Sequence, residues 1–280
     1  MSGGTLYVVA TPVGNLRDIT LRALDVLRGA DIVAAEDTRH SRILLQHYGI
    51  AAQLFALHEH NEQAASERLV GWLREGKSVA LISDAGTPAI CDPGALLVRK
   101  VTDAGFTVVP VPGPSALAAA LSVSGIAQAG FRFEGFLPSR HGERSALLEK
   151  LAASGEALVF YEAPHRIVEA MRDVAQCYGA ARGVVLCREL TKHFESVHRC
   201  LSGEAPQWLE ADANRQRGEF VVIVEGAKIE TLPEEEIAQV LTMLLPELPL
   251  KQAVALATKL TGAKRNAVYA LALKMQEQSG

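Results

Sequence analysis

The sequence predicts an α/β protein with two α/β domains followed by a small C-terminal helical domain. In its first part, short apolar runs typical of buried strands alternate with amphipathic segments typical of helices, which is the pattern of a mostly parallel sheet. This pattern changes near residues 125–130, after which strands follow one another with less helix between them. Beyond residue 229 only helical segments fit. We therefore expect domains at residues 1–127, 128–228 and 229–280.

Composition argues against a highly basic, a membrane-spanning or a disulfide-bonded protein. The chain has 280 residues, 49% of them hydrophobic, and a formal net charge of -4, so any nucleic-acid contact must come from a local basic patch. No apolar run is long enough to span a bilayer, and residues 1–5 lack a signal-like basic segment. The four cysteines form no C-x-x-C pair, which favours reduced thiols. We expect a cytoplasmic protein that contacts no membrane and holds no metal.

The first domain is predicted from five strand-like runs and the helical segments between them. Asp18 or Thr20 caps a helix whose apolar face includes Leu24, and Gly49 ends the next helix. After the fifth run, residues 112–116 lead into an alanine-rich helix. The expected strands are 5–10, 32–35, 54–57, 79–82 and 107–111.

A long loop, Ser83–Gly94, follows one of these buried strands and is stiffened by glycine and proline. Ligands of open α/β sheets bind at such strand ends. Asp92 and Pro93 predict an N-cap and the first turn of the following helix. Two more strand exits, at Pro12 and Pro164, also place a small residue before proline. Each such turn is ordinary in an α/β protein, but together the three loops are suited to frame one cleft.

The second domain is predicted to contain a partly antiparallel sheet. Helices are expected at about residues 145–153 and from Arg166 to about Cys177. Polar segments follow two of the strands, at residues 162–166 and 188–192. The expected strands are 131–137, 157–161, 184–187, 195–200 and 220–224.

Residues 71–78 match the phosphate-loop pattern G-x-x-x-x-G-K-[ST], but the order of elements is wrong for nucleotide binding. That motif works between a preceding strand and a following helix, whose N-terminal amides hold the phosphates. Here a helix precedes the motif and the strand at 79–82 follows it. We therefore reject nucleotide hydrolysis and interpret Gly76 as a helix stop.

The C-terminal segment predicts three helices, at residues 234–245, 250–260 and 263–275, after a linker at 226–236. Two short helices joined by a glycine-containing turn are typical of a helix-turn-helix. No acidic residue lies between Leu248 and Gln276, whereas five basic residues do. This basic face either contacts nucleic acid or is simply solvated.

Eight different short motifs are spread along the chain between about Thr5 and Met275. They are residues 11–16, 34–39, 83–88, 111–114, 134–138, 162–166, 188–192 and 218–220. Together they resemble the tetrapyrrole methylase family, the class III S-adenosylmethionine-dependent methyltransferases, and within it the members that act on ribosomal RNA. Any one motif would be weak, but the set is specific. Cys91 departs from the family pattern, in which a small polar residue is expected at that position.

The resemblance implies a fold, a cofactor and a substrate. It implies two α/β domains with S-adenosylmethionine in the cleft between them, and a homodimer. It also implies 2'-O-methylation of a cytidine in the decoding region of small-subunit ribosomal RNA, within the small ribosomal subunit. One alternative is methylation of a tetrapyrrole precursor or another small molecule, which leaves the C-terminal domain without an obvious use. The other is a non-catalytic, cofactor-sensing protein that binds nucleic acid.

The candidate site residues fall into three sets. Carried over by motif, cofactor contacts are expected at Pro12, Asp84, Ala85, Gly86, Ile90, Ser115, Ala116, Tyr161, Ala163, Leu190 and Gly218. Strand exits supply Glu36, Asp37, His165, Glu189 and Lys192 as candidates for a general base or for positioning the acceptor, and we expect the base among the first three. Glu36 or Asp37 is also placed to pair with Arg39, and Glu189 with Arg188. Contacts to RNA are expected from Arg39, Arg140, Arg144, Arg166, Lys192, Lys264 and Arg265.

Overall fold

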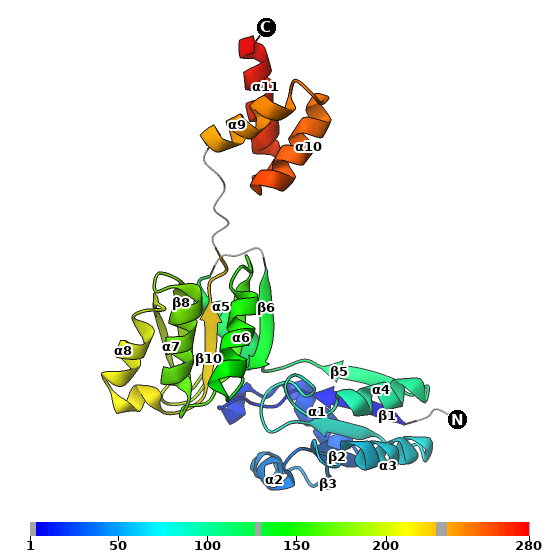
Figure 1. The fold of residues 1–280 in the computed structure, drawn as a ribbon. Coiled ribbons are helices and arrows are strands. Elements are labelled where there is room, and N and C mark those ends of the chain that lie inside the picture. Colours follow the sequence, from blue (N-terminus) through cyan, green and yellow to red (C-terminus); the bar gives the residue numbers. More distant parts are fainter. Residues whose placement is uncertain (1–3, 127–129, 228–233, 280) are drawn as a thin grey trace. The chain divides into compact units, whose positions relative to one another are not determined.

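The chain folds into two compact units, Met1–Gly226 and Ala227–Gly280, in a computed structural model that describes residues 4–126, 130–227 and 234–279 (Figure 1). Over these described residues, the first unit contains two five-stranded sheets and the second contains three helices. The predicted domain boundaries, after residues 127 and 228, both lie outside the described residues, as does most of the predicted linker.

The first sheet is entirely parallel, where the sequence predicts a mostly parallel one, and its strand order is β3-β2-β4-β1-β5. Its central strands are buried on both faces. In β2, residues Ile32 and Ala34 face one apolar core and Val33 and Ala35 face another, on the opposite side of the sheet. The strands are β1 Thr5–Val9, β2 Ile32–Ala35, β3 Gln53–Ala56, β4 Val79–Ile82 and β5 Thr107–Val111.

The helices that cover the first sheet begin and end close to the predicted positions. They are α1 Leu21–Gly29, α2 Thr38–His47, α3 Glu62–Arg74 and α4 Ala95–Asp103, with a short 3-10 helix at Leu16–Asp18. Thr20 caps α1, since its side-chain oxygen accepts a hydrogen bond from the N–H of Ala23 at 3.1 Å. Because α3 ends at Arg74 and β4 starts at Val79, residues 71–78 have the element order that excludes a phosphate loop.

One predicted cap is wrong. Helix α4 begins at Ala95 with Gly94 as its N-cap, so neither Asp92 nor Pro93 begins it. The Glu62 carboxylate, from the start of α3, accepts hydrogen bonds from the N–H groups of Gly94 and Leu96 at 2.8 and 3.2 Å. A side chain distant in sequence thus satisfies the helix amides, which leaves Asp92 free to face elsewhere.

The second sheet is mixed, as predicted, with the order β6-β7-β10-β8-β9. Strands β6 and β7 are parallel, whereas β10 runs antiparallel to both β7 and β8, and β8 pairs antiparallel with β9. The strands are β6 Phe131–Phe136, β7 Ala157–Glu162, β8 Gly183–Arg188, β9 Ser196–Leu201 and β10 Phe220–Val224.

Helices cover both faces of the second sheet. One face packs under α6 His141–Leu151, α7 Ile167–Tyr178 and α8 Ala205–Glu210, which is followed by a 3-10 helix at Ala213–Gln216. The other face packs under α5 Ala116–Ser124. Helix α5 follows β5 of the first sheet in the chain but contacts β8, β9 and β10 of the second. The chain therefore passes between the two sheets at the loop that leads into α5.

The second unit consists of α9 Glu234–Leu244, α10 Leu250–Thr261 and α11 Arg265–Ser279. Their shared apolar core includes Leu241, Val254 and Val268. Gly262, with a φ of 67°, ends α10 and begins the turn to α11. Within the described parts of the chain, no helix combines the length and the apolar character needed to cross a membrane.

Candidate active site

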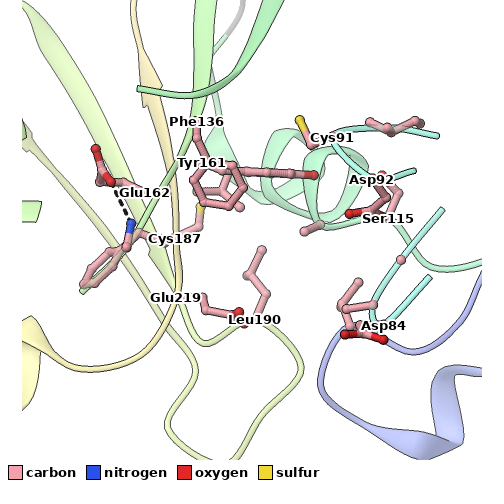
Figure 2. A pocket seen from close by; sticks show the side chains of 18 of the residues that line it. Asp84, Cys91, Asp92, Ser115, Phe136, Tyr161, Glu162, Cys187, Leu190 and Glu219 are labelled. Carbon is pink, nitrogen blue, oxygen red and sulfur yellow. Dashed lines mark hydrogen bonds between the residues drawn. The ribbon is translucent and has the colours of Figure 1, made fainter. Parts of the chain in front are cut away.

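A cavity of about 480 Å³ is lined by strand-end residues of both sheets (Figure 2). From the first sheet it is lined by the loops after β1, β2, β4 and β5, because the carboxyl ends of parallel strands meet at one edge. From the second sheet it is lined by the carboxyl ends of β6, β7 and β8 and by the amino end of β10. Since β10 is antiparallel to its neighbours, Phe220 lies opposite Glu162 and Arg188, at their end of the sheet.

The loop Ser83–Gly94 after β4 is held by the exits of β1 and β5. Thr11 and Gly86 exchange two backbone hydrogen bonds, with N···O distances of 2.8 and 3.0 Å. The Thr87 hydroxyl donates to the carbonyl of Pro114 at 3.1 Å. Gly86 has a φ of 82°, which favours glycine and lets the backbone come close to a ligand. The loop therefore forms a pre-organised wall of the cavity.

Two carboxylates tie the exits of the neighbouring strands β2 and β4 together. The backbone N–H of Asp37 donates to Oδ1 of Asp84 at 3.1 Å, and the backbone N–H of Asp84 donates to the Glu36 carboxylate. The Asp37 side chain instead interacts with helix α2, which it precedes. Its carboxylate caps α2 and lies 2.7 Å from the Arg39 guanidinium. Glu36 and Asp84 thus face the cavity, and Asp37 does not.

The cavity lining is strongly acidic. The described residues that line it include six carboxylates and one ammonium group. The carboxylates are Glu36, Asp84, Asp92, Glu162, Glu189 and Glu219. Burial raises the pKa of Glu36, and the charges of Asp92 and Asp84 raise it further. Burial likewise raises the pKa of Asp92. A cavity of this sign favours a cationic ligand and repels an anionic one.

Lys192 is the one cation among the described lining residues, and it is held between two carboxylates. Its Nζ lies 2.7 Å from Glu189 Oε1 and 2.9 Å from Glu219 Oε2. Burial opposes its charge, but these two carboxylates raise the pKa of Lys192 above its usual value. Its aliphatic chain packs against Gly14, where a Cβ would lie 3.0 Å from the Lys192 Cε. The ammonium group is thus already neutralised within the site.

Two aromatic rings form the apolar wall on the side of the second sheet. Phe136, at the end of β6, meets Tyr161 of β7 with ring centroids 5.6 Å apart and planes at 69°. Burial raises the pKa of Tyr161 to about 12, and it raises the pKa of Cys187 to about 11. Both groups are therefore protonated at neutral pH, and Cys187 offers no thiolate nucleophile.

The structure places nine of the eleven residues expected to contact a cofactor around this cavity. They are Asp84, Ala85, Gly86, Ile90, Ser115, Ala116, Tyr161, Ala163 and Leu190. Pro12 lies instead in a smaller pocket that also includes Asp84. Gly218 lies next to the lining residue Glu219, and a Cβ at position 218 would collide with the Glu189 side chain. The absence of a Cβ at Gly218 leaves room for the Glu189 side chain.

The three candidate bases lie in different surroundings. Glu36 lines the cavity. Asp37 does not, and its hydrogen bonds and ion pair with Arg39 hold the pKa of that carboxyl well below its usual range, which makes it a poor proton acceptor. His165 is exposed in the turn before α7 and is not among the lining residues.

The expected RNA contacts are scattered, and one of them is wrong. Arg144 is only 2% exposed, because α6 begins about one turn earlier than predicted and directs this side chain toward Asp173 of α7, at 2.6 Å. It cannot reach a phosphate. Arg166 is 18% exposed and lies 2.6 Å from the buried carboxylate of Glu162.

The remaining cations are accessible or line the cavity. Arg39 and Arg140 are exposed and pair with Asp37 and with Glu143. Lys264 and Arg265 are exposed at the start of α11 in the second unit.

Several lining residues were not predicted from the sequence. They are Val13, Thr87, Cys91, Asp92, Phe136, Glu162, Pro164, Cys187, Glu219, Phe220 and Val221. Most lie inside a motif quoted above or in the loop Ser83–Gly94, but none was singled out as a contact. That Phe220 and Val221 reach the cavity depends on the direction in which β10 runs, because only an antiparallel β10 brings its amino end to the carboxyl ends of β7 and β8.

Two family models together match most of the chain. The model for Tetrapyrrole (Corrin/Porphyrin) Methylases matches residues 5–206, and the model for the RsmI C-terminal HTH domain matches residues 231–276. The chain therefore belongs to the tetrapyrrole methylase family, and it is a methyltransferase with S-adenosylmethionine as methyl donor.

Relatives of nearly the same length point to a particular branch. Ribosomal RNA small subunit methyltransferase I of Escherichia coli O157:H7 is 50% identical over 277 residues, which covers 98% of this chain and 96% of the relative. The protein of the same name from Pseudomonas aeruginosa is 50% identical over 282 residues and is matched over the full length of both chains.

Solved structures with low sequence identity share the fold. Uroporphyrin-III-C-methyltransferase from Thermus thermophilus has a TM-score of 0.58 at 20% identity, covering 79% of this chain and 94% of that one. The methyltransferase CobJ has a TM-score of 0.60 at 17% identity, covering 80% and 95%.

The cavity lining fits S-adenosylmethionine. This molecule carries a sulfonium and an ammonium cation, a carboxylate and a flat adenine. The carboxylates of Glu36, Asp84 and Asp92 complement the cations, and Ala116 and Leu190 offer apolar surface. A volume of about 480 Å³ also lies within the range of about 300–1,000 Å³ that is usual for small-molecule sites.

Proposed function

We propose that this chain methylates the 2'-hydroxyl of a cytidine in the decoding region of small-subunit ribosomal RNA, cytidine 1402. The observation that carries the proposal is full-length similarity. Relatives named Ribosomal RNA small subunit methyltransferase I match 98–100% of the chain at 50% identity, including the helix-turn-helix segment. We further propose that the protein acts in the cytoplasm, as a homodimer, on RNA within the small ribosomal subunit.

The chemistry asks the chain to position two groups and to accept one proton. When bound, S-adenosylmethionine supplies an electrophilic methyl group on sulfur. The acceptor oxygen forms a C–O bond as the C–S bond breaks, and the hydroxyl proton passes to a base. Pre-organised loops lower the entropic part of the barrier. We assign the base to Glu36, because it lines the cavity, whereas Asp37 and His165 do not and Glu189 and Lys192 are paired with each other. The raised pKa of Glu36 also makes it a stronger base than an ordinary carboxylate.

The charge of the cavity supports a nucleoside acceptor. The ribose hydroxyl and the base are neutral, so they can enter an acidic site while the phosphates stay outside it. Tetrapyrrole precursors carry several carboxylates, which the lining carboxylates of Glu36, Asp84 and Asp92 would repel. The cations Arg39, Arg140, Lys264 and Arg265 are the proposed phosphate contacts, because they are exposed, although Arg39 and Arg140 each form an ion pair. Arg166 and Lys192 are only 18% and 28% exposed and are held by carboxylates.

A radiolabelled methyl-transfer assay tests the proposal. We expect the purified protein to label undermethylated small ribosomal subunits, at one nucleotide that primer extension can map, and not to label a free tetrapyrrole precursor. Labelling of the tetrapyrrole alone would support the small-molecule reading. Binding of both S-adenosylmethionine and subunits without any transfer would support a non-catalytic sensor.

A further inference from the structure

Phe136 is unusually exposed for a large aromatic side chain at the end of a strand. It is 56% exposed, although it lines the cavity. Its contact with Tyr161 is edge-to-face, so the two rings do not cover each other. Figure 2 shows the two side chains close together, with Asp84, Asp92 and Ser115 on the other side of the cavity. An aromatic surface is therefore open to the cavity, opposite its acidic wall.

A β-bulge in β6 gives Phe136 this direction. Phe133 pairs with Val159 of β7, and an unbroken register would place residue 135 opposite Tyr161. The register instead shifts between Phe133 and Gly135, so that Phe136 lies opposite Tyr161. Because side chains alternate along a strand, one inserted residue moves Phe136 onto the face that carries Phe133 and Tyr161. Without the bulge, Phe136 would point to the opposite face of the sheet.

Gly135 makes the bulge possible and brings it close to the other wall of the cavity. Its φ is 72°, in the region that favours glycine. A Cβ at this position would lie 2.9 Å from the Sγ of Cys91, in the loop after β4. The bulge therefore lies directly against the loop that forms the acidic wall, and the distance between the aromatic and acidic walls is set there.

We infer that Phe136 is the stacking platform for the base of the acceptor nucleotide. This inference rests on the proposed function and adds the residue that holds the substrate. A nucleotide of structured RNA must leave its stack before its ribose hydroxyl can reach a donor inside a cavity. Proteins hold such splayed-out bases by stacking them on aromatic side chains. The carboxylates opposite suit the cationic donor, which leaves the aromatic wall for the neutral base.

Substitutions at Phe136, with Phe131 as the matched control, test the inference. Phe131 is a phenylalanine of the same strand, is 50% exposed and is not among the lining residues. We expect F136A and F136L to lower kcat/KM for undermethylated small subunits by about 10- to 100-fold, because both remove the aromatic face. F136W should stay within a few-fold of the wild type, and F131A should be unchanged. The Kd for S-adenosylmethionine, measured by calorimetry, should change by less than about twofold throughout.

Several outcomes would overturn the inference. One is an F136L variant with wild-type kcat/KM, since leucine keeps apolar bulk without a π face. Another is a Kd for S-adenosylmethionine that rises in parallel with the loss of activity, because the ring would then serve the donor. A wild-type protein that labels no small subunit at all would refute the proposed function itself. If the wild type is active and F136A is too, only the role of Phe136 is lost.

A cross-linking experiment provides a second measurement that does not depend on turnover. With a photoreactive benzophenone at position 136, we expect primer extension to stop at the methylated cytidine or its direct neighbour. The same group at position 131 should give no stop there. A stop pattern that is equal at both positions would contradict the inference.

Discussion

The guanidinium of Arg144 and the carboxylate of Asp173 form a buried ion pair between α6 and α7. Nε lies 2.6 Å from Oδ2, and the two side chains are 2% and 8% exposed. Nη1 of Arg144 also donates to the carbonyls of Pro138 and Ser139, both at 3.2 Å. This one side chain therefore anchors the loop that follows β6, the strand that carries Phe136 into the cavity.

Removing Arg144 should destabilise the protein strongly. R144A leaves the buried Asp173 carboxylate without its guanidinium partner, with the exposed His141 ring at 3.1 Å as its remaining contact, and we expect the free energy of unfolding to fall by about 3–5 kcal/mol. Urea denaturation measures this loss. The control is R140A, which removes an exposed arginine paired with Glu143 at 3.1 Å and should cost less than about 1 kcal/mol. Equal losses in the two variants would contradict the assignment of Arg144 to the core.

Asp84 is expected to combine a structural role with a binding role, and two variants separate them. D84A leaves the N–H of Asp37 without its acceptor and should cost about 1–3 kcal/mol in stability. D84N keeps an oxygen acceptor and should be nearly as stable as the wild type. Both variants remove a negative charge from the cavity, so both should weaken S-adenosylmethionine binding by about tenfold or more in calorimetry. Unchanged binding by D84N would leave Asp84 with a structural role alone.

The proposed base predicts a particular pH dependence. Glu36 must be ionised to accept the proton, and burial raises its pKa, so the single-turnover rate should rise with pH through that raised pKa. At saturating S-adenosylmethionine, E36Q should lower the single-turnover rate by about 10²–10⁴-fold and abolish this dependence. E36Q with a near-normal rate would exclude Glu36 as the base.

The raised pKa of Glu36 also predicts that E36Q, which lowers the rate, stabilises the fold. An ionised Glu36 is less favourable in the folded than in the unfolded state, so E36Q should raise the melting temperature at pH 8. The gain should shrink as the pH falls through the folded-state pKa and vanish below the unfolded value, where the carboxyl is protonated in both states. Calorimetric melting curves between pH 4 and 8 test this. A gain that grows toward low pH would contradict it.

The basic residues of the second unit predict a salt dependence. Lys264 and Arg265 are exposed at the start of α11, and if each contacts a phosphate, K264A and R265A should each reduce the slope of log K against log salt by about 0.7–0.9. The control is R28A, since Arg28 is an exposed arginine of the first unit, paired with Asp25 at 3.3 Å. Filter-binding titrations of small subunits measure the slopes. Slopes equal to that of R28A would assign the helical unit a packing role.

Much of the cavity could be predicted because local patterns and strand direction determine it. Buried runs such as 79–82 identify the strands, and parallel pairing brings their carboxyl ends together. Residues of the loop after β4, Asp84 to Gly86 among them, were therefore expected at a ligand site. The rejection of the phosphate-loop pattern at 71–78 needed only the order of helix and strand.

The errors come from contacts between residues that are distant in the chain. Asp92 has the local features of a helix cap, but the carboxylate of Glu62, thirty-two positions before Gly94, takes that place. Arg144 belongs to a polar segment of the kind that usually faces water. Its burial depends on Asp173, twenty-nine positions later, which compensates the charge.

The sequence by itself determined the alternation of elements, the exits at which a ligand binds and the family to which the motifs belong, because these depend on neighbours within a few residues. Only the tertiary structure decided which groups face the cavity. The antiparallel direction of β10 brings Phe220 to the cavity. Glu62 accepts the hydrogen bonds of the first amides of α4, so Asp92 does not cap that helix and lines the cavity instead. The bulge at Gly135 directs Phe136 into the cavity. Each of these depends on the pairing of strands or on a long-range hydrogen bond, and neither leaves a local signal in the chain.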